Sequence, residues 1–275
     1  MRRECPNSAC KNHDQPPRGW YRKHGTRTTT RGLVKRYQCV ACRATWSARP
    51  ATTKQKRPEL NRLVATLAVS GMSLRRIAVV AGCSRTTVAR KIKMLAERAW
   101  GLHVDRCPTT SHAMMDELET FVGARWRQVS VCVVIRAKTQ EILGIDAAVK
   151  PSNMKKGQAM GWTVDGRPAM VQRVLEGVAL YLKPGATLTT DGKTDYPTVL
   201  ALAVPGAIHH PVVSPKGQPG AYNPLFPIDH LFAKMRQDLP RLFRSTWSQS
   251  KDIVWLRRVL WLYVAWTNGY DLSRG

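Results

Sequence analysis

The chain has few acidic residues. Its 275 residues include 18 Asp and Glu against 44 Lys and Arg, which gives a formal net charge of +26. Such an imbalance bears on partners and solubility, not on fold, and it indicates a polyanionic partner. Residues 1–100 hold 23 of the basic and 4 of the acidic residues, a net +19, which leaves +7 for the remaining 175. We therefore expect the first third of the chain to make most of the electrostatic contacts with this partner.

Long apolar runs are also missing. No run reaches the roughly 18 residues of a membrane-spanning helix, and the opening MRRECPNSAC has charges but no apolar signal-peptide core. DNA is thus favoured over an anionic membrane as the polyanion. An apolar fraction of 43% is nevertheless enough for a folded core. We expect a soluble, cytoplasmic, nucleoid-associated protein of two or three domains.

Four of the seven cysteines form two close pairs, C-x4-C and C-x2-C, separated by a long basic loop. In a reducing compartment they are better metal ligands than disulfide partners. Two such pairs can close on one tetrahedral zinc ion, and four protein ligands leave no open position for chemistry. The pattern predicts a structural Zn²⁺ site, with four unligated thiols as the alternative, made of Cys5, Cys10, Cys39 and Cys42.

Residues 59–98 carry apolar side chains at helical spacing. A helix ending at Gly71 is followed by two more, joined by the turn Ala81-Gly82-Cys83, and Ser84 is a good N-cap for the last. This is the pattern of a helix-turn-helix, whose second helix can enter the DNA major groove. The alternative is a basic helical hairpin that only packs. The side chains predicted to contact DNA are Arg85, Thr86, Arg90 and Lys93.

From about residue 111 the pattern changes to β-strands alternating with helices. Three strand-like segments come first, then a helix over 167–182, the strand-like ATLTTDG, a short strand IHHPVV, and helical segments over 228–270 broken by Pro240. This order predicts an α/β domain with a mixed sheet flanked by helices.

Two aspartates fall on or at the ends of these strands and one near a helix start, namely Asp116, Asp191 and Asp229. Carboxylates at neighbouring strand ends can converge, and three of them can hold two divalent cations with room for phosphate oxygens. Simpler explanations are turn formation for an aspartate that follows a strand, such as Asp191, and helix-dipole complementation for Asp229. The competing acidic residues are Glu117, Glu119, Asp195 and Asp238.

The order of these parts resembles the bacterial DDE transposases of insertion sequences, nearest to the insertion sequence one-like group. The resemblance covers nearly the whole chain, from RYQCVAC through the helix-turn-helix, MMDELETF and LTTDGKTDYP to DHLFAKMRQDLPRLFRSTWSQSK. It implies a zinc-ribbon-like DNA-binding module (1–49), a basic linker (50–58), a helix-turn-helix module (59–105) and an RNase H-like catalytic domain (106–275).

The resemblance further implies that the three aspartates hold two catalytic Mg²⁺ (or Mn²⁺) ions. Asp229 stands where the family often has glutamate, so its carboxylate reaches one methylene less far. One ion would lie between Asp116 and Asp191 and the other between Asp116 and Asp229, for in-line displacement at phosphorus. Phosphate contacts are expected from four basic residues near the last acid, Arg236, Arg241, Arg244 and Lys251.

The expected function is a transposase that binds element-end DNA as a homo-oligomer and catalyses strand cleavage and strand transfer. The alternative is a non-enzymatic zinc and helix-turn-helix DNA-binding protein derived from a transposase with a disabled site. A third possibility is a nuclease of the same superfamily acting on RNA or in repair.

Overall fold

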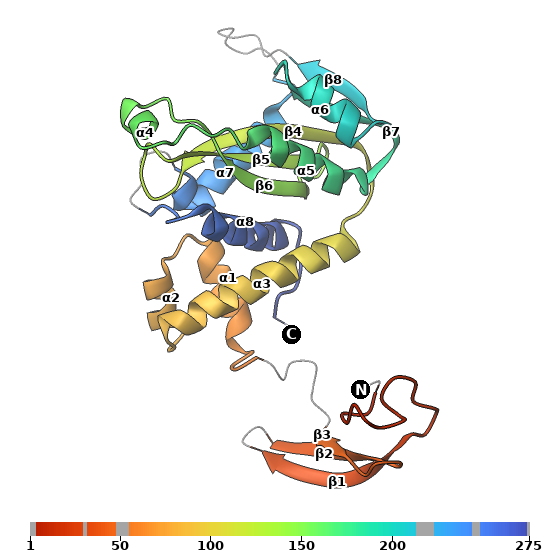
Figure 1. Cartoon of the computed structure of the whole chain (residues 1–275). Helices are drawn as coiled ribbons and strands as arrows, with labels where there is room; N and C mark the ends of the chain where they lie inside the picture. Colours follow the sequence, from red (N-terminus) through yellow and green to blue (C-terminus); the bar gives the residue numbers. More distant parts are fainter. Residues whose placement is uncertain (1–3, 30–31, 48–54, 213–222, 244–247, 274–275) are drawn as a thin grey trace. The chain divides into compact units, whose positions relative to one another are not determined.

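The computed structural model describes residues 4–29, 32–47, 55–212, 223–243 and 248–273 (Figure 1). The chain divides into two compact units, one ending at Pro58 and the other beginning at Glu59. Among the described residues, no helix has the length and apolar character needed to cross a membrane.

The first unit is a three-stranded antiparallel sheet attached to the cysteine-containing loops. Its strands are β1 (Tyr21–Thr29), β2 (Gly32–Cys39) and β3 (Thr45–Ser47), in the order β1-β2-β3. A bulge interrupts the β1–β2 pairing between Lys23 and Thr26. Gly25 lies in this bulge with φ of 75°, a conformation that glycine adopts without steric cost.

The second unit opens with three helices: α1 (Leu60–Val69), α2 (Leu74–Val80) and α3 (Arg85–Arg106). Ser84 caps α3 as predicted, because its side chain accepts a hydrogen bond from the Thr87 N–H. Val88, Ile92 and Leu95 are buried along one side of α3, as the helical spacing of its apolar residues predicted.

A mixed five-stranded sheet forms the centre of this unit, in the order β6-β5-β4-β7-β8. β4 pairs antiparallel with β5 and β5 with β6, whereas β4, β7 and β8 run parallel. The strands are β4 (Thr110–Phe121), β5 (Gln128–Arg136), β6 (Ile142–Val149), β7 (Leu182–Asp191) and β8 (Ile208–Val212). The predicted α/β class with a mixed, helix-flanked sheet is confirmed.

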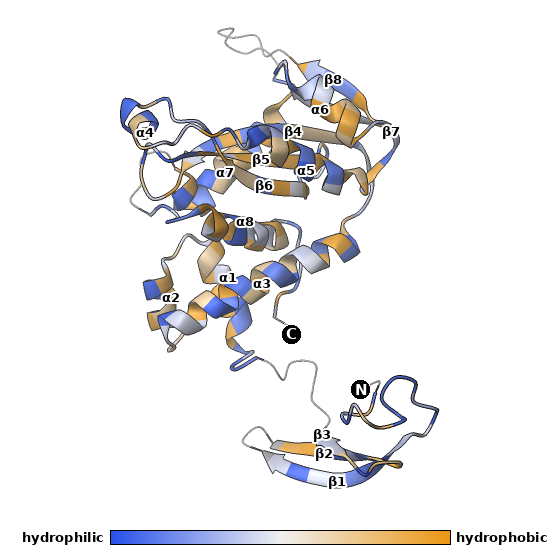
Figure 2. Cartoon of the chain, viewed as in Figure 1, coloured by the Kyte–Doolittle hydropathy of each residue, from blue (hydrophilic) through white to orange (hydrophobic). Residues whose placement is uncertain are grey.

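Helices pack on both faces of this sheet (Figure 1). One face carries α5 (Arg167–Ala179) and α6 (Tyr196–Ala203), and the other carries α7 (Phe226–Asp238) and α8 (Ile253–Thr267). The short elements are α4 (Lys155–Ala159) and the 3₁₀ turn η1 (Pro240–Leu242). Figure 2 shows apolar residues along β5, β6 and α8, where sheet and helices meet.

The helices α1 and α3 share a hydrophobic core with α8 and the sheet face beneath it. Residues 59–105 are therefore not detached from the sheet, and the compact unit runs through the predicted boundary at residue 105. α5 ends three residues before the predicted Leu182, because that residue begins β7.

Candidate functional site

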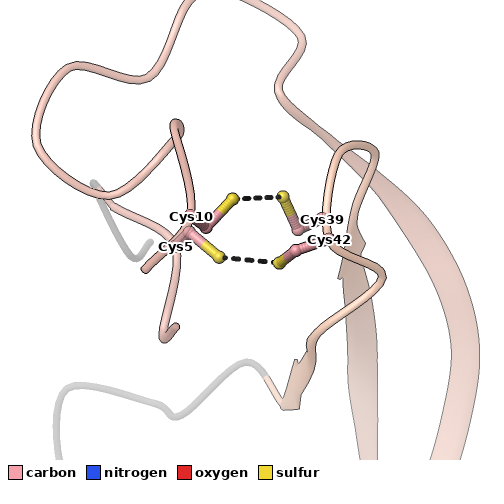
Figure 3. A group of neighbouring side chains, drawn as sticks. All are labelled: Cys5, Cys10, Cys39 and Cys42. Atoms are coloured by element: carbon pink, nitrogen blue, oxygen red, sulfur yellow. Dashed lines mark hydrogen bonds between the residues drawn. The ribbon is translucent and has the colours of Figure 1, made fainter. Parts of the chain in front are cut away.

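The four predicted cysteine ligands meet in one cluster (Figure 3). Their sulfur atoms all lie within 4.8 Å of one another, with 3.4 Å between Cys5 and Cys42 and 3.8 Å between Cys10 and Cys39. Four sulfurs at about 2.3 Å from a tetrahedral zinc ion are about 3.8 Å apart. The cluster thus has the donor set and spacing that a structural zinc ion requires.

Asn12, two residues after Cys10, donates hydrogen bonds to two sulfur atoms of this cluster. Its side-chain amide donates to Cys39 Sγ at 3.4 Å, and its backbone N–H donates to Cys10 Sγ at 3.5 Å. Burial raises the pKa of Cys5 to about 12. Burial also acts on Cys39, but N–H donors from Cys42 and Asn12 outweigh it and lower the pKa of Cys39 to about 6. Cys39 is therefore the cysteine whose metal-binding thiolate form is favoured, whereas the raised pKa of Cys5 favours its thiol.

Among the residues that the structure describes, no histidine nitrogen joins this cluster. His13 Nδ1 lies 2.7 Å from the backbone oxygen of Cys5, so this nitrogen is engaged in fixing the loop. Trp20 and Trp46 stack at 5.0 Å between ring centroids next to the cluster, with Tyr37 buried beside Trp46. Trp20 and three of the cysteines form the buried apolar core of the first unit, and Trp46 packs against it.

Two of the predicted acidic residues lie on adjacent parallel strands. The β4–β7 register includes Met115 paired with Thr190, and Asp116 and Asp191 are the next residues on each strand. Adjacent strands are about 4.8 Å apart and paired residues point to the same face. The carboxylates of these two residues, 75 positions apart in the sequence, thus start from neighbouring backbone positions.

Asp229 approaches the same face from the first turn of α7, which packs against β4. The Asn223 amide donates to its carboxylate at 2.7 Å. The pKa of Asp116 is raised to about 6, first by burial and then by the negative charges of Asp191 and Asp229. The backbone N–H of Glu117 acts in the opposite direction. The carboxylates of Asp191 and Asp229 are therefore close enough to Asp116 to raise its pKa.

One buried carboxylate oxygen among these three acids lacks a hydrogen-bond partner in the described part of the chain. Asp191 Oδ1 is buried without a hydrogen-bond partner among the described residues. A buried oxygen of this kind is costly unless a cation or donor reaches it. Mg²⁺ and Mn²⁺ prefer oxygen ligands. The three aspartates supply carboxylate oxygens, one of which has no other partner within the described ranges, so these residues fit such an ion.

The three acids are nevertheless spread wider than the cysteines. Within the described part of the chain, the cysteine cluster is the only set of three or more Cys, His, Asp or Glu ligand atoms within 4.8 Å. One ion bound by all three carboxylates does not match this spacing. Two ions about 3.5–4 Å apart are compatible with the wider spacing, because carboxylates that bind different ions need not lie next to each other.

Glu117, named from the sequence only as a competing acid, contacts three residues that the sequence did not identify: Ser130, Lys193 and Tyr196. Lys193 Nζ lies 3.8 Å from Asp191 Oδ2 and 3.2 Å from Glu117 Oε1. Glu117 is buried on the opposite face of β4, as strand alternation predicts, and accepts hydrogen bonds from Tyr196 and Ser130. Burial alone would raise the pKa of Glu117, but Ser130 and Lys193 lower it. A signal was present, since Lys193 and Tyr196 share the TDGKTDYP motif with Asp191.

The other competing acids have different partners. Glu119 forms an ion pair with Lys150, and Asp238 accepts a hydrogen bond from Tyr263 Oη at 2.9 Å. Asp195 precedes α6 without a side-chain capping bond. Neither Glu119 nor Asp238 is available as a bare carboxylate.

The predicted DNA-contacting residues differ in exposure. The four on α3, including Arg85 and Lys93, are exposed. Arg236 is half-buried, and Arg241 is largely enclosed, so that burial lowers its pKa and its guanidinium faces Ser250 Oγ at 3.4 Å. Lys251 is exposed, and Arg244 lies outside the described residues.

The histidines near the acids have neighbours of their own. His209 Nε2 lies 2.9 Å from Thr190 Oγ1, and His230 Nδ1 lies 3.2 Å from Gln140 Oε1. These contacts agree with a structural role for both rings. In comparisons with known proteins, no family model matches the chain, and no curated protein matches it.

Proposed function

We propose that this protein is a metal-dependent DNA-cleaving and strand-transferring enzyme of the DDE transposase type. Its catalytic domain would be RNase H-like and comprise residues 106–275, with Asp116, Asp191 and Asp229 as the acidic site. Its substrates would be the duplex ends of a mobile element and a target duplex, brought together by a homo-oligomer.

One observation carries this proposal above the others. Asp116 and Asp191 stand side by side on the parallel strands β4 and β7, and Asp229 is close enough to raise the pKa of Asp116. The orphaned Asp191 Oδ1 adds an acceptor with no role inside the fold. Stability alone does not account for two carboxylates placed where they disfavour the charge of buried Asp116, and a perturbed acid in such a cluster is typical of functional sites.

The acidic site would hold the ions through oxygens of its three carboxylates. When bound, Mg²⁺ ions supply Lewis-acid activation of a water or 3′-hydroxyl nucleophile and stabilise the leaving oxygen. Asn223 holds the Asp229 carboxylate by its amide donor, and Lys193 holds the second oxygen of Asp191. These contacts leave Asp191 Oδ1 free to face a cation.

DNA recognition would come from elements outside the acidic site. We interpret α2 and α3 as a helix-turn-helix, because Ala81–Ser84 forms a short connection and the exposed amino-terminal turn of α3 carries Arg85 and Thr86. Residues at this end of a recognition helix reach base edges in the major groove. The cysteine cluster would fix a second, zinc-dependent DNA-binding module.

The decisive experiment is a nicking assay on duplexes taken from the DNA on either side of the coding sequence, with Mg²⁺ or Mn²⁺. Asp116→Asn and Asp191→Asn should abolish nicking while leaving DNA affinity in the absence of Mg²⁺ within about twofold. Glu176→Gln, an exposed change on α5 whose only described contact is with Gln172, is the matched control and should nick normally. Undiminished nicking by either aspartate variant would rule out this acidic site.

A non-enzymatic DNA-binding protein is the second candidate, and the wide spacing of the three acids favours it. Asp229→Glu separates the two possibilities, because it lengthens the third carboxylate by one methylene. An active site should keep or increase its nicking rate with this variant. A binding protein should show no metal-dependent nicking in either form, yet retain DNA affinity.

A further inference from the structure

The hairpin of β1 and β2 extends well beyond the apolar core of the first unit. We call this hairpin the ribbon. The core at its root is the cysteine cluster with Trp20, Tyr37 and Trp46. From Arg22 to Thr28 every side chain of β1 is exposed, and Leu33 on β2 is 74% exposed. An isolated two-stranded hairpin is marginally stable in water, so packing does not explain this extension.

The ribbon has a uniform charge. No Asp or Glu occurs in the sequence between Asp14 and Glu59. Figure 2 shows β1 as hydrophilic along most of its length. With basic side chains and no carboxylate on its strands, the ribbon is complementary to a polyanion.

The register sorts three arginines onto one face. Val34, Arg36 and Gln38 alternate along β2, and their partners on β1 are Arg27 opposite Val34 and Arg22 opposite Gln38. Arg22 donates to Gln38 Oε1 at 2.9 Å, and Arg36 donates to Thr45 Oγ1 at 3.1 Å. These acceptors are neutral, so they orient the guanidinium groups without cancelling their charge. We call this side of the ribbon, with Arg22, Arg27 and Arg36, the arginine face.

We propose that the arginine face lies in the major groove of duplex DNA. Val34 and Gln38 are four residues apart, so the arginines opposite them are separated by about 14 Å along the ribbon. The major groove is about 12 Å wide and admits a two-stranded ribbon. Arg22 and Arg27 can then reach phosphates on opposite walls while Arg36 and Gln38 lie between them. The inference rests on the proposed DNA function and adds a binding element to it.

Other nucleic acids fit the ribbon less well. Single strands are usually held by exposed aromatic side chains, whereas Trp20 and Tyr37 are each only 7% exposed. The major groove of double-stranded RNA is deep and narrow, and side chains do not read it. The geometry therefore selects duplex DNA.

The test measures DNA binding by the full chain without Mg²⁺, so that no strand is cut. Arg27→Gln with Arg36→Gln removes two charges from the arginine face, and Lys23→Gln with Lys35→Gln removes two from the opposite face. Each phosphate contact contributes about 0.9 to the slope of log K against log salt. The arginine pair should lower that slope by about 0.9, the share of the Arg27 phosphate contact, and abolish protection of guanine N7 from dimethyl sulfate at the ribbon's site. The lysine pair should leave N7 protection intact.

Equal loss of protection in both pairs would mean a general basic surface and overturn the proposal. So would protection of adenine N3, which lies in the minor groove, or tighter binding to single-stranded DNA or duplex RNA than to duplex DNA. Zinc content reports folding of the first unit. If the arginine pair loses zinc, Arg27→Gln alone decides, because Arg27 is remote from the cysteines, and it should lower the slope by about 0.9.

Failure of this inference is distinguishable from failure of the proposed function. Metal-dependent nicking with N7 protection unaffected by the arginine pair rejects the ribbon and keeps the acidic site. Intact, arginine-dependent N7 protection without nicking rejects the acidic site and keeps the ribbon.

Discussion

Among individual side chains, Asp116 has the clearest conflict between folding stability and the proposed function. Its pKa in the folded protein is about 6, above the ordinary value of 3.8, because the site is buried and shared with two other carboxylates. The neutral form is therefore favoured by folding. Its stabilising contribution is fully present below about pH 4 and is lost as the pH rises through 6.

Asp116→Asn should accordingly stabilise the ion-free protein at pH 8 by up to about 3 kcal/mol, since two pKa units correspond to that amount. The gain should vanish near pH 4, where the wild-type carboxyl is protonated. Urea unfolding in EDTA at both pH values measures this difference. A gain of the same size at pH 4 and pH 8 would contradict the assignment of the raised pKa to this residue.

Lys193 is expected to act as a cationic link between the two faces of the sheet. It contacts Glu117 and Asp191, and Glu117 is almost fully buried. Lys193→Met leaves that buried carboxylate without its ionic partner and should cost about 2–4 kcal/mol in unfolding free energy. Adding Glu117→Gln removes the unpaired charge and should recover part of the loss. A double-mutant cycle by urea unfolding tests this, and strictly additive effects would show that the pair is not coupled.

Among the secondary-structure elements, the sequence was sufficient where the signal is local. The N-cap Ser84, the turn at Gly82 and the paired cysteines are all set by residues a few positions apart, and the structure agrees with them. The extent of β4 and β7 follows from a pairing between distant segments. The sequence could thus predict that Asp191 lies at the end of a strand. It could not predict the contact between Lys193 and Glu117, because that contact depends on the strand register.

The helix α3 shows a second long-range feature that its sequence does not reveal. His103 is buried, with Nε2 2.9 Å from the backbone oxygen of Leu143 on β6 and Nδ1 3.2 Å from Tyr270 Oη. Burial lowers the pKa of His103, so the neutral ring is the folded form. This stabilisation is present above the ordinary pKa of 6.5 and is lost as the pH falls below it.

His103→Leu should therefore destabilise the protein by about 1–3 kcal/mol at pH 8, because it leaves the Leu143 carbonyl without its donor. The difference in unfolding free energy between the variant and the wild type should be smaller at pH 5, because protonation of buried His103 also destabilises the wild type. His210→Leu, an exposed change on β8, is the control and should alter stability by less than about 0.5 kcal/mol. A difference that widens at pH 5 would contradict a neutral His103.

For the chain as a whole, composition predicted a basic amino-terminal region but not how the chain divides. The spacing of motifs suggested separate modules at 59–105 and 106–275, whereas α1 and α3 share a core with α8. Apolar residues at helical spacing show that a helix has a buried face, but not what covers it. The boundary between the two units near residue 58 is the one that the sequence marks, by the polar segment with two prolines at 47–58.

This division predicts how the protein should respond to removal of the zinc ion proposed for the cysteine cluster. The core of the first unit consists of little more than Cys5, Cys10, Cys39 and the neighbouring rings, and so small a core rarely folds without a metal or disulfide. The second unit has two hydrophobic cores of its own, on the two faces of its sheet. A strong chelator should therefore unfold residues 4–47 and leave 59–273 folded.

Hydrogen exchange read by mass spectrometry resolves the two units in one experiment. Peptides from β1–β3 should lose protection after chelation, and peptides from β4–β7 should keep it. Cys42→Ser should reproduce the effect without a chelator, whereas Cys83→Ser, outside the cluster, should not. Protection of β1–β3 that persists without metal would show that the aromatic stack holds the sheet by itself. Because the ribbon is rooted in this cluster, the loss of protection should be accompanied by loss of guanine N7 protection on bound duplex DNA.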